Sequence, residues 1–164
     1  MTTKQICIGL ACLLTAALAV PAAAKVVFGT GKQDRIRGTS GNDRLFGEGK
    51  DDRIIARGGK DYVEGGSGED VITGDGGRDR ILGESGDDLI DGGPGNDVID
   101  GGTGSDTIIG GPGRDRIVGG EGNDSIYVRD GERDVVRCSS GKEDRVIADR
   151  RDRVAKSCES VIKR

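Results

Sequence analysis

The sequence predicts an all-β solenoid that is closed by a cap at its C-terminal end. The 164-residue chain contains 31 glycines and only 2% aromatic residues, so it lacks the large apolar side chains that an ordinary globular core needs. Such a composition is typical of a disordered linker, a collagen-like chain or a solenoid. Glycine does not recur at every third position, which excludes collagen, and a nine-residue period favours the solenoid.

The first 24 residues are predicted to form a secretory signal peptide. A basic start precedes the apolar stretch Ile6–Val20, and Ala22–Ala24 forms an A-x-A site, so we expect cleavage after Ala24. The alternatives are an uncleaved membrane anchor and a lipoprotein modified at Cys12. The apolar stretch is short for a full span, and Gly9 stands where a lipobox needs an aliphatic residue. The mature chain is therefore expected to be secreted and extracellular, with no membrane span.

Eleven repeats of nine residues follow a short leader at residues 25–28. An aspartate recurs at every ninth position: Asp34, Asp43, Asp52, Asp61, Asp70, Asp79, Asp88, Asp97, Asp106, Asp115 and Asp124. Two positions after each stands an aliphatic residue: Ile36, Leu45, Ile54, Val63, Ile72, Ile81, Ile90, Ile99, Ile108, Ile117 and Ile126. Glycine stands two positions before each aspartate except at Lys32 and Lys50, and five positions before each except at Ala56. The unit is G-G-x-G-x-D-x-U-x and covers residues 29–127, where U is aliphatic.

Each part of this unit has a local structural meaning. A three-residue x-U-x segment makes a very short strand, with the aliphatic residue facing inward and its two neighbours facing outward. The glycines supply a tight turn, because glycine reaches positive φ without strain.

The unit resembles the RTX, or haemolysin-type, calcium-binding nonapeptide repeat. The resemblance implies a right-handed parallel β-roll in which two nonapeptides make one coil, so that residue i stacks on residue i+18. It also implies a stand-alone secreted bacterial protein that folds when it binds Ca²⁺. Family members usually leave the cell by a type I route with a C-terminal signal, and the predicted N-terminal signal departs from that.

The resemblance places Ca²⁺ between stacked aspartates. Carboxylates stacked about 4.8 Å apart repel by about 3–4 kcal/mol at an effective dielectric near 20, and a dication between them reverses that sign. Turn carbonyls complete an all-oxygen shell, which suits Ca²⁺. We expect metal at Asp70, Asp79, Asp88, Asp97, Asp106, Asp115 and Asp124. We expect weaker binding at Asp34, Asp43, Asp52 and Asp61, where Lys32, Lys50 or Ala56 interrupts the glycine pattern.

The stack offers nine positions between neighbouring aspartates, and we expect several Ca²⁺ ions but fewer than nine. Nine dications would make the mature chain strongly positive. The hypothesis is that arginines beside the aspartates replace part of the metal: Arg35, Arg44, Arg53, Arg80, Arg114 and Arg116.

Residues 128–164 are predicted to form degenerate repeats and a cap. Asp134, Asp144 and Asp152 are echoes of the repeat at spacings of ten and eight, and a solenoid needs an atypical unit at its end. Arginines and acidic residues interleave here, so we expect a salt-bridged cap rather than a nucleic-acid surface.

Two cysteines remain after export, Cys138 and Cys158, and in an oxidising compartment they most simply form a disulfide. Closing a loop of about 20 residues contributes on the order of 3 kcal/mol in the chain-entropy model. Two free thiols or a metal pair are the alternatives, and the absence of histidine argues against zinc.

The composition also argues against an enzyme. The chain has no histidine, so it has no Ser/His or Cys/His pair, and its aspartates already have a repeat-wide structural role. The sequence therefore predicts a secreted calcium-binding repeat protein. The alternative is a structural or adhesive cell-surface or matrix module in which calcium only rigidifies the roll. Its partner at the surface or matrix is not identified by the sequence.

Overall fold

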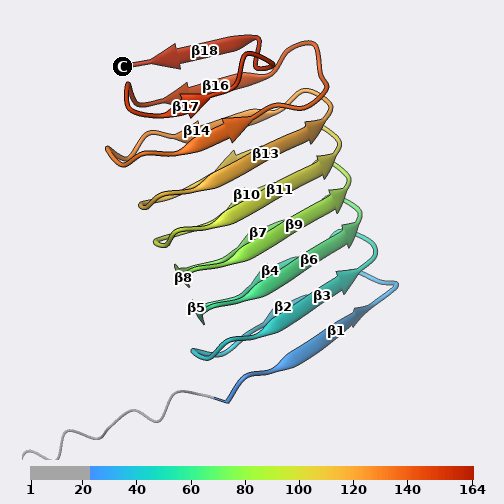
Figure 1. The fold of residues 1–164 in the computed structure, drawn as a ribbon. Coiled ribbons are helices and arrows are strands. Elements are labelled where there is room, and N and C mark those ends of the chain that lie inside the picture. Colours follow the sequence, from blue (N-terminus) through green and yellow to red (C-terminus); the bar gives the residue numbers. More distant parts are fainter. Residues whose placement is uncertain (1–22) are drawn as a thin grey trace, which may run out of the picture.

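The computed structural model of the chain describes residues 23–164 (Figure 1). Over this range the regular elements are all β-strands, and they stack as a parallel β-solenoid of about eight turns, which confirms the predicted fold class. The predicted signal peptide lies outside the described residues except for Ala23 and Ala24, and so do Cys7 and Cys12. No helix with the length and apolar character of a membrane span occurs between residues 23 and 164.

The strands form two long parallel sheets, one on each side of the solenoid. Along the axis, the first sheet contains β1 (Val26–Thr30), β3 (Arg44–Glu48), β6 (Tyr62–Ser67), β9 (Arg80–Ser85), β11 (Val98–Thr103), β13 (Arg116–Glu121), β15 (Val135–Arg137) and β17 (Arg153–Val154). The second contains β2 (Arg35–Arg37), β4 (Arg53–Ile55), β7 (Val71–Thr73), β10 (Leu89–Asp91), β12 (Thr107–Ile109), β14 (Ser125–Val128), β16 (Arg145–Ala148) and β18 (Ser160–Lys163). A small third sheet pairs β5 (Gly58–Gly59) with β8 (Gly76–Gly77).

Two nonapeptides make one coil, as the resemblance implied. In the repeats each residue pairs with the residue 18 positions later, for example Ile81 with Ile99 and Ile72 with Ile90. In the cap the offset becomes 19 between β13 and β15, 20 between β14 and β16, and 15 between β16 and β18. The turns absorb these insertions and the final deletion, so the ladder continues through the degenerate repeats to the C-terminus.

The core is a narrow column with one large aliphatic side chain per repeat. All eleven predicted inward residues, from Ile36 to Ile126, are at most 5% exposed, and Val136 and Val146 continue the column into the cap. Their neighbours in each strand face outward, because side chains alternate along a strand. This column confirms the predicted orientation of the x-U-x segments.

Glycine at the first position of the repeat allows the coils to approach closely. A Cβ atom at Gly92 would lie 2.6 Å from the carbonyl oxygen of Gly110 and 2.9 Å from Oδ2 of Asp97. Both distances are shorter than real Cβ contacts allow, so a side chain there would push the next coil away. In the cap, larger side chains replace this inward glycine: Val128 follows Gly110 in the stack and Cys138 follows Gly119.

The predicted disulfide joins Cys138 and Cys158, whose Cα atoms are 5.0 Å apart. Both residues are buried and belong to the hydrophobic core, so the bridge closes the C-terminal end of the column from within. The cap is thus tied to the last coils covalently as well as by β18, which pairs with β16.

The turns also require residues with positive φ angles. Residues at the second and fourth positions of the repeat adopt them, and five of these residues are not glycine: Glu48, Lys50, Arg57, Asp75 and Glu84. Lys50 has φ 74°, whereas its counterparts one and two coils later, Gly68 and Gly86, have φ 132° and 131°. A left-handed conformation costs a residue with a Cβ roughly 1–2 kcal/mol.

Replacing Lys50 with glycine is therefore expected to stabilise the fold. Relief of the left-handed strain outweighs the extra entropy of glycine in the unfolded chain, for a net gain of about 0.5–1 kcal/mol. The matched control is Lys60→Gly, an exposed lysine outside the positive-φ set, which should lose about 0.5–1 kcal/mol instead. Urea unfolding of both variants in saturating Ca²⁺ measures the difference, and equal effects of the two substitutions would contradict the strain argument.

Candidate metal centre

Two rows of stacked aspartates run along the two turn edges of the solenoid. The first row precedes the strands of the second sheet and contains Asp34, Asp52, Asp70, Asp88, Asp106, Asp124 and Asp144. The second row precedes the strands of the first sheet and contains Asp43, Asp61, Asp79, Asp97, Asp115, Asp134 and Asp152. All except Asp34 are buried, with at most 4% of their surface exposed. The solenoid thus buries about one carboxyl group for each aliphatic side chain.

One oxygen of each carboxylate is bound within the stack. Oδ1 accepts a hydrogen bond from the backbone N–H of the aspartate one coil earlier, at 2.7–3.1 Å, in an unbroken series from Asp52 to Asp152. Each carboxylate therefore reaches back toward the preceding coil. These bonds fix the orientation of the side chain and leave the second oxygen, Oδ2, facing the turn.

Eleven of the Oδ2 atoms are buried and have no hydrogen-bond partner. They belong to Asp52, Asp61, Asp70, Asp79, Asp88, Asp97, Asp106, Asp115, Asp124, Asp134 and Asp144. The ends of the rows differ. Asp34 Oδ2 accepts bonds from the N–H and Oγ1 of Thr30, and Asp43 Oδ2 accepts the same pair from Thr39. Asp152 Oδ2 accepts the N–H of Asp149 at 2.6 Å.

Burial raises the pKa of the eleven carboxyls whose Oδ2 has no partner, because the ionised form loses its hydration. The pKa rises to about 6 for Asp61, Asp70, Asp97, Asp106 and Asp134, to about 7 for Asp79 and Asp88, and to about 8 for Asp115. The hydrogen bond from the preceding aspartate lowers each pKa. Stacked carboxylates raise it again, as Asp97 and Asp61 do for Asp79. A charged row is therefore costly without a compensating cation.

The donors that surround these atoms are all oxygens. The space beside Gly92 lies between the carbonyl oxygen of Gly110 and Oδ2 of Asp97, so carboxylate and main-chain oxygens converge in the turns. No three Asp, Glu or Cys side chains gather closely enough for a purely side-chain metal site in residues 23–164. A cation held here would use one or two carboxylates together with backbone carbonyls. That donor set fits the hard cation Ca²⁺ and does not fit metals that prefer thiolate or imidazole.

The structure divides the predicted metal residues in a way that the sequence pattern did not. The seven aspartates expected to bind metal all have an unpartnered Oδ2. Of the four expected to be weaker, Asp52 and Asp61 share this property, whereas Asp34 and Asp43 are satisfied by threonines. Asp134 and Asp144 belong with the eleven, although sequence reasoning treated them only as echoes of the repeat. The signal was the aliphatic pair after each: Val135-Val136 and Val146-Ile147.

The arginines do not replace metal in the rows, which corrects that hypothesis. Arg35, Arg44, Arg53, Arg80, Arg114 and Arg116 are all exposed, because they flank the inward aspartates and so face outward. The cap is solvated as expected, but the expected salt bridges do not form among residues 128–164. In the described part of the chain a single ion pair forms, between Arg114 Nε and Glu132 Oε2 at 3.8 Å. Arg145, Arg150, Arg151 and Arg153 of the cap are exposed to solvent instead.

Comparison with known proteins identifies a family. The family model of the RTX calcium-binding nonapeptide repeat (4 copies) matches residues 28–63, 37–72, 64–99, 73–108 and 100–132. These segments together extend over more than half of the chain. No curated protein sequence matches the chain. The matched segments contain the eleven repeats and end before Asp134, Asp144 and Asp152.

In metal-free buffer, the fold is expected to be more stable at about pH 5 than at about pH 8. In the folded chain the pKa reaches about 6–8 for eight buried carboxyls, those of Asp61, Asp70, Asp79, Asp88, Asp97, Asp106, Asp115 and Asp134, against about 3.9 in an unfolded one. Between these values the folded chain binds more protons, so the free energy of unfolding falls as the pH rises. Far-UV circular dichroism in chelator measures the folded fraction at both pH values, and urea unfolding gives the midpoint wherever the chain is folded. A higher midpoint at the alkaline pH would contradict it.

Proposed function

Because the chain belongs to the RTX calcium-binding nonapeptide repeat family, we propose that it is a secreted protein whose folding is coupled to Ca²⁺ binding between its stacked aspartate turns. The observation that carries this proposal is the set of eleven buried Oδ2 atoms without partners. An unpaired buried charge is strongly unfavourable, and a bound cation removes that cost. Calcium supplies positive charge here and no reaction chemistry, and the roll is a structural fold rather than a catalytic one.

The narrow core explains why the chain needs the metal. Each nonapeptide buries one large aliphatic side chain, while its glycines lose much conformational entropy on folding. Neighbouring carboxylates in a row repel one another when ionised, as Asp106 and Asp70 do when they raise the pKa of Asp88. Ca²⁺ reverses the sign of this interaction, so cation binding and folding become a single process.

The Ca²⁺-holding residues are proposed to be those from Asp52 to Asp144 that lack a partner for Oδ2. Asp34, Asp43 and Asp152 lie at the ends of the rows, and protein donors already satisfy them. Both rows therefore begin on hydrogen bonds, and the second row also ends on one at Asp152. The first row ends at Asp144, whose Oδ2 has no partner. This assignment adds Asp134 and Asp144 to the repeat positions and withdraws Asp34 and Asp43.

Secretion fits the same chemistry. Extracellular calcium modules typically bind at about 10⁻⁴–10⁻³ M, which is far above free cytosolic calcium, so the chain would remain unfolded until export. The disulfide Cys138–Cys158 is of the kind that persists in oxidising compartments. The predicted signal peptide, residues 1–24, supplies the route in this proposal.

Titration of the chain from Lys25 to Arg164 with Ca²⁺ at about pH 8 is expected to produce a cooperative coil-to-β transition at roughly 10⁻⁴–10⁻³ M. Mg²⁺ should not replace it, because Mg²⁺ demands a small octahedral shell and keeps its water. Far-UV circular dichroism follows the transition. A chain that is already β-structured in chelator at this pH and does not respond to Ca²⁺ would refute the coupling.

A second test separates the structural assignment from the sequence motif. Asp144→Asn lies outside the matched repeats but removes the charge of an unpartnered carboxylate, so it should lower the number of bound Ca²⁺ ions by about one. The matched control, Asp34→Asn, lies inside the motif at a carboxylate that Thr30 satisfies, and should leave the number unchanged.

Equilibrium dialysis at saturating Ca²⁺ counts the ions in each variant, and circular dichroism verifies that each variant is folded. Loss of an ion from Asp34→Asn but not from Asp144→Asn would show that the motif, rather than the unpartnered oxygen, selects the metal positions.

A further inference from the structure

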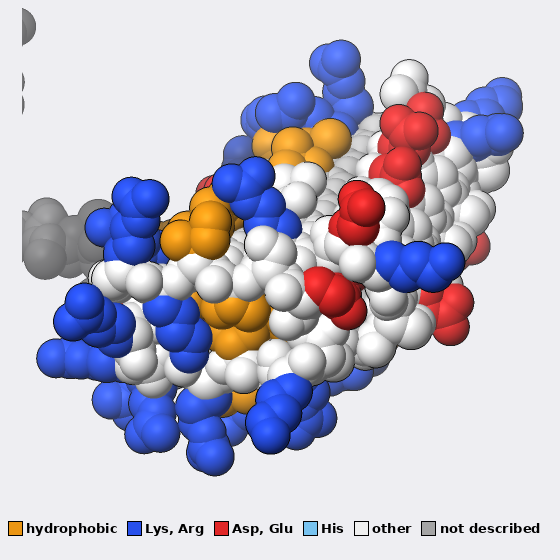
Figure 2. Space-filling view, turned by 90° about the horizontal axis from the view of Figure 1, so that it is seen from above, with side chains coloured by type: hydrophobic (Ala, Val, Ile, Leu, Met, Phe, Trp, Pro, Cys, Tyr) orange, Lys and Arg blue, Asp and Glu red, His pale blue; other side chains and the backbone are white. Residues whose placement is uncertain are grey.

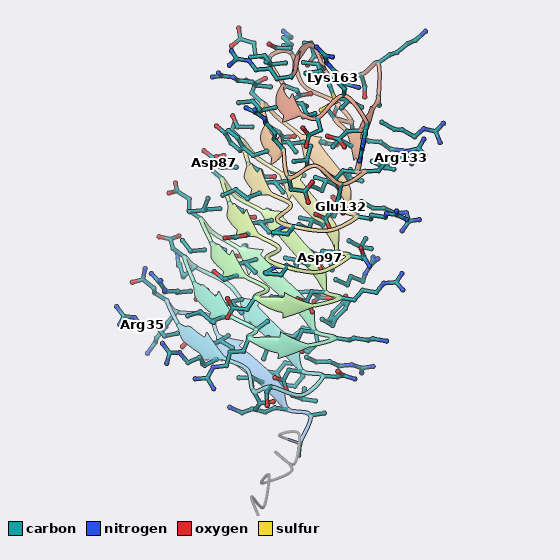
Figure 3. All side chains as sticks on the ribbon, turned by 90° about the vertical axis from the view of Figure 1, so that its left-hand side faces the viewer. Arg35, Asp87, Asp97, Glu132, Arg133 and Lys163 are labelled. Atoms are coloured by element: carbon teal, nitrogen blue, oxygen red, sulfur yellow. A yellow bond between two sulfur atoms is a disulfide. The ribbon has the colours of Figure 1, made fainter. Side chains whose placement is uncertain are left out.

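The two turn edges of the solenoid carry very different charge. The positions directly before and after each member of the second aspartate row include nine basic residues and no acidic one. These nine form what we call the basic ridge: Arg44, Lys60, Arg78, Arg80, Arg114, Arg116, Arg133, Arg151 and Arg153. The corresponding positions around the first row include four acidic residues, Asp51, Glu69, Asp87 and Glu143, and three basic ones, Arg35, Arg53 and Arg145. In Figure 3, Arg133 and Asp87 lie on opposite sides of the stack.

The β-ladder arranges the basic ridge as a straight row. Tyr62 pairs with Arg80, Arg80 with Val98, and Val98 with Arg116, each one coil apart. Neighbouring coils are separated by about 4.8 Å, so the cations repeat along the solenoid axis at small multiples of that distance. Arg78, Arg114, Arg116 and Arg133 line a surface hollow in the middle of the ridge, together with Asn96. The ridge is thus a rigid linear array rather than a flexible tail.

The positive charge of the basic ridge is almost uncompensated by the protein. All nine side chains are exposed. Between residues 23 and 164 the one ion pair is Arg114–Glu132, and both of its side chains are more than half exposed. Figure 2 shows Lys and Arg side chains projecting outward from the stack. Unpaired like charges stacked along a ridge repel one another. The chain has a net charge of −4, so it contains enough acidic residues to pair with these cations, yet none directly flanks the second row.

We propose that the basic ridge binds a linear anionic polysaccharide through its uronate or sulfate groups. A guanidinium group binds a planar carboxylate, or two oxygens of a sulfate, with paired hydrogen bonds. Five of the seven coils of the second row offer such a group on the basic ridge, and a sixth offers Lys60. A straight row of cations is complementary to a chain that carries charge at regular intervals. The ligand would neutralise the repulsion that the fold itself leaves in place.

Two other polyanions fit the ridge less well. Single-stranded nucleic acid is usually held by aromatic rings on which bases stack, and Tyr62, the one aromatic among the flanking positions, has its hydroxyl bound to Glu64. Anionic membranes are usually engaged with apolar side chains beside the basic ones. Leu89, Ile109 and Tyr127 are exposed on the second sheet. Val26 and Phe28 are exposed on β1, where Val26 pairs with Arg44 at the N-terminal end of the ridge, but no exposed large apolar residue lies on the ridge between Lys60 and Arg153.

This inference rests on the proposed function only because Ca²⁺ keeps the roll folded. Asp115 lines the same hollow as Arg114 and Arg116, so a cation held by the second row would also remove negative charge beneath the ridge. Calcium is therefore expected to favour the polysaccharide complex. The failure of calcium-dependent folding would be visible in circular dichroism before any binding measurement is made.

The test compares two triple variants of the Ca²⁺-loaded chain. Arg78→Gln/Arg116→Gln/Arg133→Gln removes three cations from the basic ridge, and Arg35→Gln/Arg53→Gln/Arg145→Gln removes three arginines from the opposite edge. All six side chains are exposed, so both variants should fold as the parent does. Binding is measured by biolayer interferometry on immobilised heparin, a sulfated chain, and on immobilised short polygalacturonate, a uronate chain.

The ridge variant should bind about ten-fold more weakly than the parent, as expected when several exposed charge pairs are lost together, and the control less than about two-fold. Binding to heparin alone or to polygalacturonate alone supports the proposal and identifies the anionic group. Equal weakening in both variants would overturn it, because net charge would then explain the binding. Tighter binding of the parent to duplex DNA or to anionic vesicles, or no binding by folded protein, would also overturn it.

Discussion

The hydrogen bond from each aspartate amide to the carboxylate one coil later organises the rest of the molecule. It brings a potentially charged group into the interior at every ninth residue and holds it there with one oxygen bound and the other free. Neutral carboxyls or a cation are the two ways to make such a row stable. The raised pKa values describe the first solution and bound Ca²⁺ would provide the second. The same geometry thus lets protons or a cation stabilise the fold, and the two compete for the same carboxylates.

Strand alternation separates the two kinds of charge. Aspartate and the aliphatic residue two positions later face inward, so the residues beside them must face outward. Arg78 and Arg80 therefore project into solvent although they flank Asp79 in the sequence. This is why the arginines cannot neutralise the rows. The row aspartates are buried in the turns while the arginines beside them remain at the surface, so the folded protein exposes a larger share of its basic than of its acidic residues.

Much of the architecture follows from the period alone. The spacing of Asp97 and Ile99, repeated along the chain, was sufficient to predict the solenoid and the inward column, whereas the two rows followed from the two-repeat coil that the family resemblance implied. The ends of the rows were not predictable from that pattern. Thr30 and Thr39 satisfy Asp34 and Asp43 through side-chain and backbone donors whose geometry appears only once the turn is built. Asp134 and Asp144 were not predicted as metal ligands, because insertions shift them out of the nine-residue frame. The turns absorb those insertions and keep the carboxylates in register.

The direction of the aspartate hydrogen bonds also explains why the two ends of the solenoid differ. Each carboxylate reaches back one coil, so the first coil has carboxylates that need donors and the last has amides that need acceptors. At the N-terminal end, Thr30, Thr39 and the Lys25 nitrogen supply donors, the last of them to Asp43 Oδ1 at 2.6 Å.

At the C-terminal end, Glu159 Oε2 accepts the N–H of Asp144 at 3.0 Å, and the carbonyl of Asp149 accepts that of Asp152. The cap is therefore not simply a polar lid. It supplies the acceptors that a further aspartate coil would have supplied, and the buried disulfide beside it holds those acceptors against the last coils. Cleavage after Ala24 would convert the Lys25 nitrogen into a charged amino group and strengthen the corresponding bond at the other end. Both ends would then be closed by groups that complete the same ladder.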